Sequence, residues 1–432
     1  MSETTPPRPT VHVHVQHADD DERFLATDLL AWFQEPPPEP VAATLSSIDP
    51  ADRWAADLTD DADADPDRHA GIYGTYPLQV TVPGPLGTLR QVPVLGLSWV
   101  GVHPDARRRG VLTAMLAHHL AQARTGGWSG LSALHASEPA IYGRHGWGAA
   151  SLELRATLSR GATLTAPHLD TAAGRVRTRL YDAADPAVVA RVTTLMRAHA
   201  ADRLGAVALG ERTLRRFLSD NAATTRDQEP TRVMLAVEGG EDAGFAVLQR
   251  KPEWGEHAPK GTVFVWTVDG APAVRLALLR RLVDLDLTST VRLRTASPDD
   301  LVLDWTAPER GVAGSPVDSL WLRLADLPTA LAARGYAAPC DVVLDVSDTR
   351  LPDQAGRWRL RVGADGTGRA TRTDQPAQVR LDVADLGASY LGGRPLARLL
   401  EAGRLEEVEP GAVAALDAAL RSPHRLHAAV GF

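Results

Sequence analysis

Residues 97–113 constrain the fold of this chain more than any other segment. Their order, LSWVGVHPDARRRGVLT, predicts a buried strand, a short turn and a helix that begins after Gly110. The start of a helix leaves several backbone N–H groups without partners and carries the positive end of the helix dipole. Glycine has no side chain that would keep a phosphate away from these groups. The segment therefore predicts a site that accepts a pyrophosphate.

The patterns on either side of this segment predict a mixed α/β unit. Alternating apolar and polar residues favour strands, and apolar residues at helical spacing favour helices. Strands are expected at residues 11–15, 72–82, 91–102, 131–135 and 152–158, and helices at 19–33, 111–120 and 139–144. The turn-rich stretch PGPLG separates the second and third of these strands.

Two further segments follow this unit. Residues 166–310 repeat its order of strands and helices more faintly and lack the arginine-rich turn. Residues 311–432 predict a smaller α+β unit, with helix-like or strand-like patterns at 327–333, 341–346, 358–362 and 413–420. A chain of 432 residues is too long for one ordinary core, so two or three domains are expected.

Composition narrows the class of function. The formal net charge of −8 argues against nonspecific binding to nucleic acid. No apolar run approaches the roughly 18 residues that a membrane span needs, and the start of the chain lacks the pattern of a secretory signal. We therefore expect a cytoplasmic protein that binds neither nucleic acid nor membrane. The single cysteine, Cys340, excludes an internal disulfide and a cysteine-based zinc cluster.

The turn after the buried strand resembles motif A of the GNAT acetyltransferase superfamily, which reads Arg or Gln, two residues, Gly, one residue, then Gly or Ala. Arg107 and Gly110 match this motif, whereas Leu112 stands in place of the last small residue. Residues 134–147, LHASEPAIYGRHGW, resemble the second GNAT landmark, a Tyr-Gly-x-x-Gly-aromatic signature that follows a strand. Together the two segments resemble a narrower group, the enhanced intracellular survival (Eis) family of N-acetyltransferases.

This resemblance covers nearly the whole chain and implies its fold class. The class is α/β (α+β), with two tandem GNAT-type mixed-sheet domains followed by a domain like a sterol carrier protein. The implied ranges are 1–165 for the GNAT domain with the acetyl-CoA site, 166–310 for a degenerate GNAT-like domain, and 311–432 for the sterol-carrier-like domain. The resemblance also implies a homo-oligomer, namely a hexamer.

The resemblance implies acetyl-CoA as co-substrate and no metal. Backbone groups of Val100 and Val102 would hold the pantetheine arm like an added strand, and amides of residues 108–113 would cradle the pyrophosphate. The implied cofactor-binding residues are Val100, Gly101, Val102, Arg108, Arg109, Gly110, Val111, Leu112, Thr113, Ser137 and Glu138.

The resemblance also assigns two proton transfers. Tyr142 would be the general acid that protonates the departing CoA thiolate, and the carboxylate of Phe432 would be the general base. An alkylamine with a pKa near roughly 10.4 is no nucleophile until it loses a proton. A terminal carboxylate is a weak base unless its surroundings raise its pKa. The alternatives are a core aromatic for Tyr142 and plain packing for Phe432.

The first predicted helix carries the residues with which the family builds its amine-binding pocket. These are Phe24, Asp28 and Trp32 in this chain. Because aromatic residues at helical spacing usually pack in a core, core packing is the alternative for Phe24 and Trp32.

Three histidines near the start of the chain raise the question of a metal site. His12 and His14 fall on one face of the first expected strand, and His17 follows it. No third type of ligand stands at a fixed spacing from them. We therefore expect a solvated or partly packed face rather than a metal site.

The sequence thus predicts an N-acetyltransferase that moves acetyl from acetyl-CoA to a primary amine by direct attack. The acceptor would be a polycationic small molecule, such as an aminoglycoside, or lysine in a peptide. The competing hypothesis is a lipid- or acyl-carrier protein that acts through its third segment. A further alternative keeps the cofactor but changes the acyl group or the acceptor.

Overall fold

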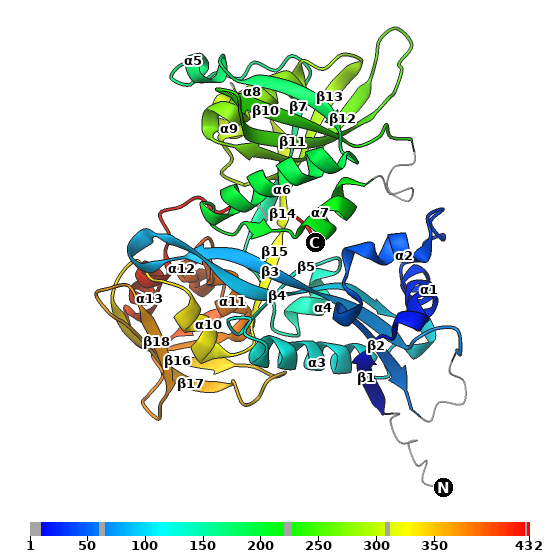
Figure 1. Ribbon diagram of the computed structural model, residues 1–432. Helices are drawn as coiled ribbons and strands as arrows, with labels where there is room; N and C mark the ends of the chain where they lie inside the picture. Colours follow the sequence, from blue (N-terminus) through cyan, green and yellow to red (C-terminus); the bar gives the residue numbers. More distant parts are fainter. Residues whose placement is uncertain (1–9, 60–64, 220–226, 307–311, 428–429) are drawn as a thin grey trace.

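The computed structural model describes residues 10–59, 65–219, 227–306, 312–427 and 430–432, and their strands form three sheets (Figure 1). Helices cover the sheets, so the architecture belongs to the mixed α/β class predicted from the sequence. The first and third sheets lie together in the lower half of Figure 1, and the second sheet lies above them. No helix in the described ranges is long and apolar enough to cross a membrane.

The first sheet has the order β1-β2-β3-β4-β5-β15-β6, with β9 beside β3. Its strands are β1 Val11–Val15, β2 Arg53–Leu58, β3 Gly71–Pro83, β4 Leu89–Val102, β5 Leu131–His135, β6 Gly148–Ala149, β9 Val207–Ala208 and β15 Leu320–Leu324. The accompanying helices are α1 Asp21–Ala31, α2 Val41–Thr44, α3 Val111–Thr125 and α4 Pro139–Gly143. Strands β4 and β5 run parallel, because α3 carries the chain back between them.

Helices α1 and α3 cover opposite faces of this sheet. Ile72 of β3 packs with Phe24 and Leu25 of α1, whereas the next residue, Tyr73, packs in one cluster with Met115 of α3. Successive side chains of a strand point to opposite faces, so the two helices lie on opposite sides of the sheet. The buried residues of α3 recur at helical spacing: Val111, Met115, Leu116, His119, Leu120 and Ala123.

The second sheet has the order β14-β7-β13-β12-β11-β10-β8. Its strands are β7 Leu152–Ser159, β8 Arg177–Asp182, β10 Arg232–Glu238, β11 Glu241–Lys251, β12 Gly261–Gly270, β13 Thr288–Ala296 and β14 Ala313–Asp318. The accompanying helices are α5 Asp170–Ala173, α6 Pro186–Ala201, α7 Glu211–Leu218, α8 Pro272–Val283 and α9 Leu301–Trp305. The parallel strands β12 and β13, joined by α8, repeat the arrangement of β4, α3 and β5.

The third sheet has the order β18-β17-β16-β19-β20 and is docked on the first. Its elements are α10 Leu327–Ala333, β16 Cys340–Ser347, β17 Gly356–Val362, β18 Gly368–Arg372, β19 Val379–Asp382, α11 Val383–Ser389, α12 Leu396–Glu401, β20 Leu405–Glu407 and α13 Ala412–Leu420. Helix α11 packs on β15 and β6 of the first sheet. Arg323 of β15 and Asp348, which follows β16, form a buried ion pair at 2.6 Å across this contact.

One strand departs from the expected organisation. The strand expected at residues 152–158 to complete the first unit lies instead in the second sheet, as β7, so that prediction is wrong. On the edge of β5 that faces away from β4, the neighbouring strand is β15. Strand β15 is buried along its whole length and therefore suits an interior position in the sheet. Strand β7 alternates between buried and exposed residues. The sheets therefore do not coincide with the ranges 1–165, 166–310 and 311–432, and the boundary at 310–311 lies outside the described residues.

Candidate active site

Strands β4 and β5 separate near the middle of β4. Their pairing is limited to residues 95–96 of β4 and 132–133 of β5, although β4 continues to Val102. On its other edge, β4 shifts register against β3 around Trp99, whose φ is 55°. A bulge of this kind bends a strand and disturbs its ladder. The backbone at the end of β4 therefore faces an opening between two parallel strands.

The turn after β4 leads directly into α3. A 3₁₀ turn at Pro104–Ala106 is followed by two residues with positive φ, Arg108 at 62° and Gly110 at 92°. The predicted helix is confirmed and begins at Val111. Apart from the two chain neighbours of Gly110, no described residue has an atom within 4 Å of the place where a Cβ on Gly110 would stand. The first N–H groups of the helix have no partner within it, so this start suits a phosphate group.

A cavity of about 670 Å³ lies where β4 ends and α3 and α4 begin. We call it the cofactor cavity. Arg109 belongs to the same turn but is absent from the cavity wall. All other predicted cofactor-binding residues line the cavity, namely Val100, Gly101, Val102, Arg108, Gly110, Val111, Leu112, Thr113, Ser137 and Glu138.

Cationic side chains gather at the cofactor cavity. Arg107 and Arg108 line it at the turn, and Arg144 lines it after α4. Arg350, from the segment between β16 and β17 of the third sheet, lines it as well. The Nε of Arg350 donates to the carbonyl oxygen of Arg144 at 3.4 Å. Burial lowers the pKa of the neighbouring His145 to about 4, and the nearby arginine charges add to this shift, so its imidazole is neutral at neutral pH. The cavity therefore suits a ligand with several negative charges.

Tyr142 lies in α4, lines the cofactor cavity and is only 7% exposed. Its ring meets that of Trp147 edge-on, with the centroids 6.2 Å apart. Burial raises the pKa of Tyr142 to about 12, with a smaller contribution from the charge of Glu138. The hydroxyl therefore stays protonated at neutral pH and holds a proton at the cavity wall.

A second cavity, of about 440 Å³, lies between the first and second sheets. We call it the interdomain cavity. Helix α7 and the C-terminus lie side by side between the two halves of the molecule, and residues of both line this cavity (Figure 1). Its lining residues are Ser47, Tyr76, Ser98, Trp99, Thr213, Arg216, Phe217, Ser219, Thr231, Gln249, Trp266, Gly431 and Phe432.

Phe432 is held by both its backbone and its ring. The hydroxyl of Ser98 donates to the main-chain oxygen of Phe432 at 3.0 Å, and in a chain that ends at Phe432 this oxygen belongs to a carboxylate. The ring meets Tyr76 and His135 edge-on, with centroids 6.2 and 5.2 Å apart. Burial lowers the pKa of His135 to about 4. This imidazole is therefore neutral and adds no positive charge beside Phe432.

The two cavities are adjacent along both strands. Trp99 lines the interdomain cavity, while Val100, the next residue of β4, lines the cofactor cavity. At the end of β5, His135 contacts Phe432, while Ser137 lines the cofactor cavity. A strand advances about 3.3 Å per residue, so the groups on the two sides lie close together. One cavity therefore stands on each side of the strand opening.

The three residues predicted to bind the amine do not gather at one surface. Phe24 is fully buried, with its ring centroid 6.5 Å from that of Trp99, so it supports the wall of the interdomain cavity from behind. Asp28 is 8% exposed, and burial raises its pKa to about 7. Trp32 is 44% exposed and lines the cofactor cavity. Phe24 and Asp28 line neither cavity.

Sequence patterns did not reveal most of the interdomain cavity. The indole N–H of Trp266, from β12, donates to the side-chain oxygen of Gln249, from β11, at 3.1 Å. Phe217 comes from α7 and Ser98 from β4. No spacing in the sequence connects residues from such distant elements. The one available signal was the apolar end of the chain at Phe432.

Comparisons with known proteins agree with this architecture. Residues 61–150 match the family model of the acetyltransferase (GNAT) domain, and residues 327–427 match that of the sterol carrier protein domain. The chain is 37% identical over 353 residues to an uncharacterised N-acetyltransferase of Streptomyces coelicolor, which covers 82% of this chain and 83% of the relative. It is 31% identical over 356 residues to the N-acetyltransferase Eis of Mycobacterium tuberculosis, and this match covers 80% of this chain and 81% of the relative.

A solved structure extends the similarity to the whole fold. The crystal structure of Eis1 from Mycobacterium abscessus matches with a TM-score of 0.76 at 27% identity and covers 98% of this chain and 100% of its own. The chain is therefore an N-acetyltransferase of the GNAT class with a C-terminal sterol-carrier-like domain. GNAT acetyltransferases use acetyl-CoA as co-substrate. Within this class the chain belongs to the Eis family of N-acetyltransferases, as its sequence motifs predicted.

Proposed function

We propose that acetyl-CoA binds in the cofactor cavity and that its acetyl group passes through the opening between β4 and β5 to a primary amine. The amine occupies the interdomain cavity and attacks the thioester directly in a ternary complex. The observation that carries this proposal is the position of the two cavities on either side of the opening, with Tyr142 at one and Phe432 at the other.

In the proposed pose, main-chain groups hold most of the cofactor. The amides of residues 108–113 hold the pyrophosphate at the start of α3, where Gly110 leaves open space. Backbone groups of Val100 and Val102 pair with the pantetheine arm, as a strand would pair with a free edge. Ser137 and Glu138 flank the arm from the end of β5. The limited pairing of β4 with β5 supports this pose, because it leaves that edge of β4 open.

The acceptor amine must lose a proton before it can attack. We assign the role of general base to the carboxylate of Phe432, which Ser98 orients. Arg216 lines the same cavity, and its charge would weaken the base, but it is paired with Glu39 at 2.8 Å. Tyr142 then donates its proton to the sulfur as the carbon–sulfur bond breaks.

The lining of the interdomain cavity indicates the class of amine. Aromatic rings attract cations, and five of them line the cavity: Tyr76, Trp99, Phe217, Trp266 and Phe432. The net charge of −8 also favours a cationic substrate. We therefore propose a polycationic amine, such as an aminoglycoside, or the lysine side chain of a peptide, as the acceptor.

Release of the CoA thiol with a panel of acceptors tests this function. The panel contains an aminoglycoside, a lysine-containing peptide, a simple monoamine and an alcohol of similar size. We expect release with amines only, and the fastest release with the polycationic amine. Absence of release with every amine, together with no heat on titration with acetyl-CoA, would favour a lipid or acyl carrier acting through the C-terminal domain.

The assembly state is a further part of the proposal. The family resemblance predicts a homohexamer. Light scattering measures the molar mass of the particle in solution and so tests this prediction. We expect a particle with six times the mass of one chain, and a particle with the mass of a single chain would contradict the proposal.

Arg350→Ala is expected to raise the KM for acetyl-CoA about fivefold, or about 1 kcal/mol, and to leave kcat nearly unchanged. Arg350 is a cation at the cofactor cavity, and it holds the cofactor equally before and during the reaction. Steady-state kinetics with varied acetyl-CoA measures the effect. Arg361→Ala, on the exposed side of β17, is the matched control and should change neither constant. An unchanged KM for Arg350→Ala would exclude the C-terminal domain from cofactor binding.

A further inference from the structure

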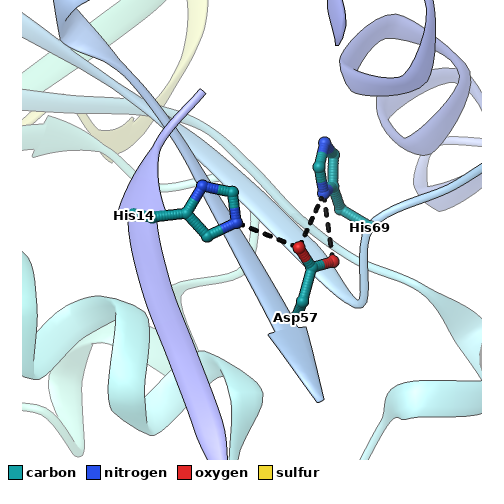
Figure 2. Close-up of side chains that lie close together, drawn as sticks. All are labelled: His14, Asp57 and His69. Carbon is teal, nitrogen blue, oxygen red and sulfur yellow. Dashed lines mark hydrogen bonds and ion pairs between the residues drawn. The ribbon is translucent and has the colours of Figure 1, made fainter. Parts of the chain in front are cut away.

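We propose that His14, Asp57 and His69 form a binding site for one divalent transition-metal ion, with zinc as the best match. The three side chains come from β1, from β2 and from the residue two positions before β3, and they converge at one edge of the first sheet (Figure 2). The Nε2 of His14 lies 2.9 Å from Oδ2 of Asp57. The Nδ1 of His69 lies 3.1 and 3.3 Å from the two carboxylate oxygens.

The strand register explains why two of these residues meet. His12 is the direct cross-strand partner of Asp57, so both point to one face of the β1–β2 pair, and His14 follows His12 on that face. His69 is held independently, because its backbone N–H donates to the hydroxyl of Thr27 at 2.9 Å. The three groups are therefore fixed by different elements before any ion binds. The sequence alone offered only the histidines of the first strand and no third ligand.

The hydrogen bonds of His14 indicate which of its nitrogens would bind the ion. Its Nδ1 lies 3.0 Å from the carbonyl oxygen of Val15, which can only accept, so Nδ1 carries the proton. The Nε2 of His14 faces Oδ2 of Asp57 at a hydrogen-bond distance of 2.9 Å. An ion that binds here would take the place of this hydrogen bond, with Nε2 and Oδ2 as two of its ligands. A neutral imidazole whose other N–H donates to a backbone carbonyl is the usual form of a metal ligand.

The side chain of His69 is fully buried, and its Nδ1 faces the carboxylate of Asp57. Nδ1 is therefore the atom that would bind the ion, and burial holds the ring in this orientation.

The spacing of the ligand atoms fits a tetrahedral ion. Zinc bonds to nitrogen and oxygen of about 2.0–2.2 Å place neighbouring ligand atoms about 3.3 Å apart. The distances between the carboxylate of Asp57 and the two imidazoles are 2.9 to 3.3 Å, and all three ligand atoms lie within 4.8 Å of one another. The side chains of His14 and Asp57 are 23% and 32% exposed, so water can take the fourth position. Two imidazoles and a carboxylate are a ligand set that zinc accepts.

Arg23 is the charge that opposes a cation here. Its Nη2 lies 3.3 Å from Oδ1 of Asp57 and also donates to the carbonyl oxygen of Arg68 at 3.1 Å. This contact occupies Oδ1 and leaves Oδ2, the oxygen nearest to His14, for the ion. Arg23 therefore orients the carboxylate as an outer-shell partner.

The position of the site indicates a structural role. None of the three residues lines the cofactor cavity or the interdomain cavity. Strand β1 is the edge strand of the first sheet, and the ion would tie it to β2 and to the chain that enters β3. Binding to the folded state alone stabilises that state in proportion to the logarithm of the ion concentration. The site can therefore be tested without any measurement of acetyl transfer.

Titration calorimetry of the full, untagged chain with zinc chloride, after dialysis against a chelator, tests this proposal. We expect one zinc ion per chain with an affinity in the micromolar range or tighter. Asp57→Asn, which keeps the size of the side chain, and the partly exposed His14→Ala should each weaken binding at least about tenfold. The melting temperature should rise with zinc in the wild type and not in these variants.

His12→Ala is the matched control, because His12 lies on the same face of the same strand but outside the proposed ligand set. It should keep the wild-type stoichiometry and nearly the wild-type affinity. Absence of saturable binding by the wild type would overturn the proposal. Equal losses in His12→Ala and Asp57→Asn would also overturn it, because they would indicate diffuse binding by surface histidines.

Discussion

Tyr142→Phe is expected to lower kcat about 100-fold, the usual contribution of a general acid, and to leave the affinity for acetyl-CoA nearly unchanged. The substitution removes one hydroxyl and keeps the ring that packs against Trp147. Without that hydroxyl, the thiolate leaves without a proton, which raises the barrier of the chemical step alone. Initial rates of thiol release and calorimetric titration with acetyl-CoA measure the two quantities separately.

The matched control is Tyr181→Phe, a tyrosine of the second sheet that lies outside both cavities and stacks with Arg191. Its kcat should equal that of the wild type. The pH profile gives an independent check: burial raises the pKa of Tyr142 to about 12, so the acid keeps its proton from neutral pH well into the alkaline range. The profile of kcat should therefore show no alkaline decline from this group below that range. A Tyr142→Phe variant with wild-type kcat would remove Tyr142 from the reaction.

Three glycines added after Phe432 are expected to lower kcat at least about 100-fold without changing the melting temperature. The extension turns the terminal carboxylate into a peptide carbonyl, which takes up no proton at neutral pH. The ring of Phe432 still has its pocket against Tyr76 and His135, so the tail can stay docked. Rates of thiol release and thermal unfolding measure the two effects.

Two companion proteins make this second prediction specific. The same three glycines at the N-terminus should leave kcat unchanged. Phe432→Ala keeps a terminal carboxylate but removes the ring, so it should lose less activity than the extended chain. Full activity in the extended chain would show that the base lies elsewhere and that Phe432 serves only in packing.

The sequence predicted the local parts of the cofactor site because their signals are local. The strand, turn and helix of residues 97–113 lie next to one another in the chain, and the positive φ of Gly110 explains why glycine stands there. The helices expected at 111–120 and 139–144 were likewise predicted from local patterns and are present as α3 and α4. Each of these features is decided within a few turns of backbone.

The sequence could not predict features that depend on distant partners. The five residues of β15 are apolar except Arg323, and nothing in them shows that they insert beside β5 while β7 moves to another sheet. Arg350 reaches the cofactor cavity only because the third sheet docks on the first. The same holds for His69, which reaches Asp57 because the strand that it precedes, β3, pairs with β2. Burial on both faces and contacts between domains become visible only in three dimensions.

We propose that the backbone amides at the start of α3 bind the phosphates of acetyl-CoA, and the proposed reaction depends on this contact. Calorimetric titration of acetyl-CoA into the wild type and into Gly110→Val tests it most directly. A β-branched side chain at a φ of 92° strains this turn and fills the open space above the backbone. We predict one acetyl-CoA per chain for the wild type and at least about tenfold weaker binding for the variant, with both proteins folded. Equal binding by the two proteins, or no binding by the wild type at millimolar ligand, would contradict the account.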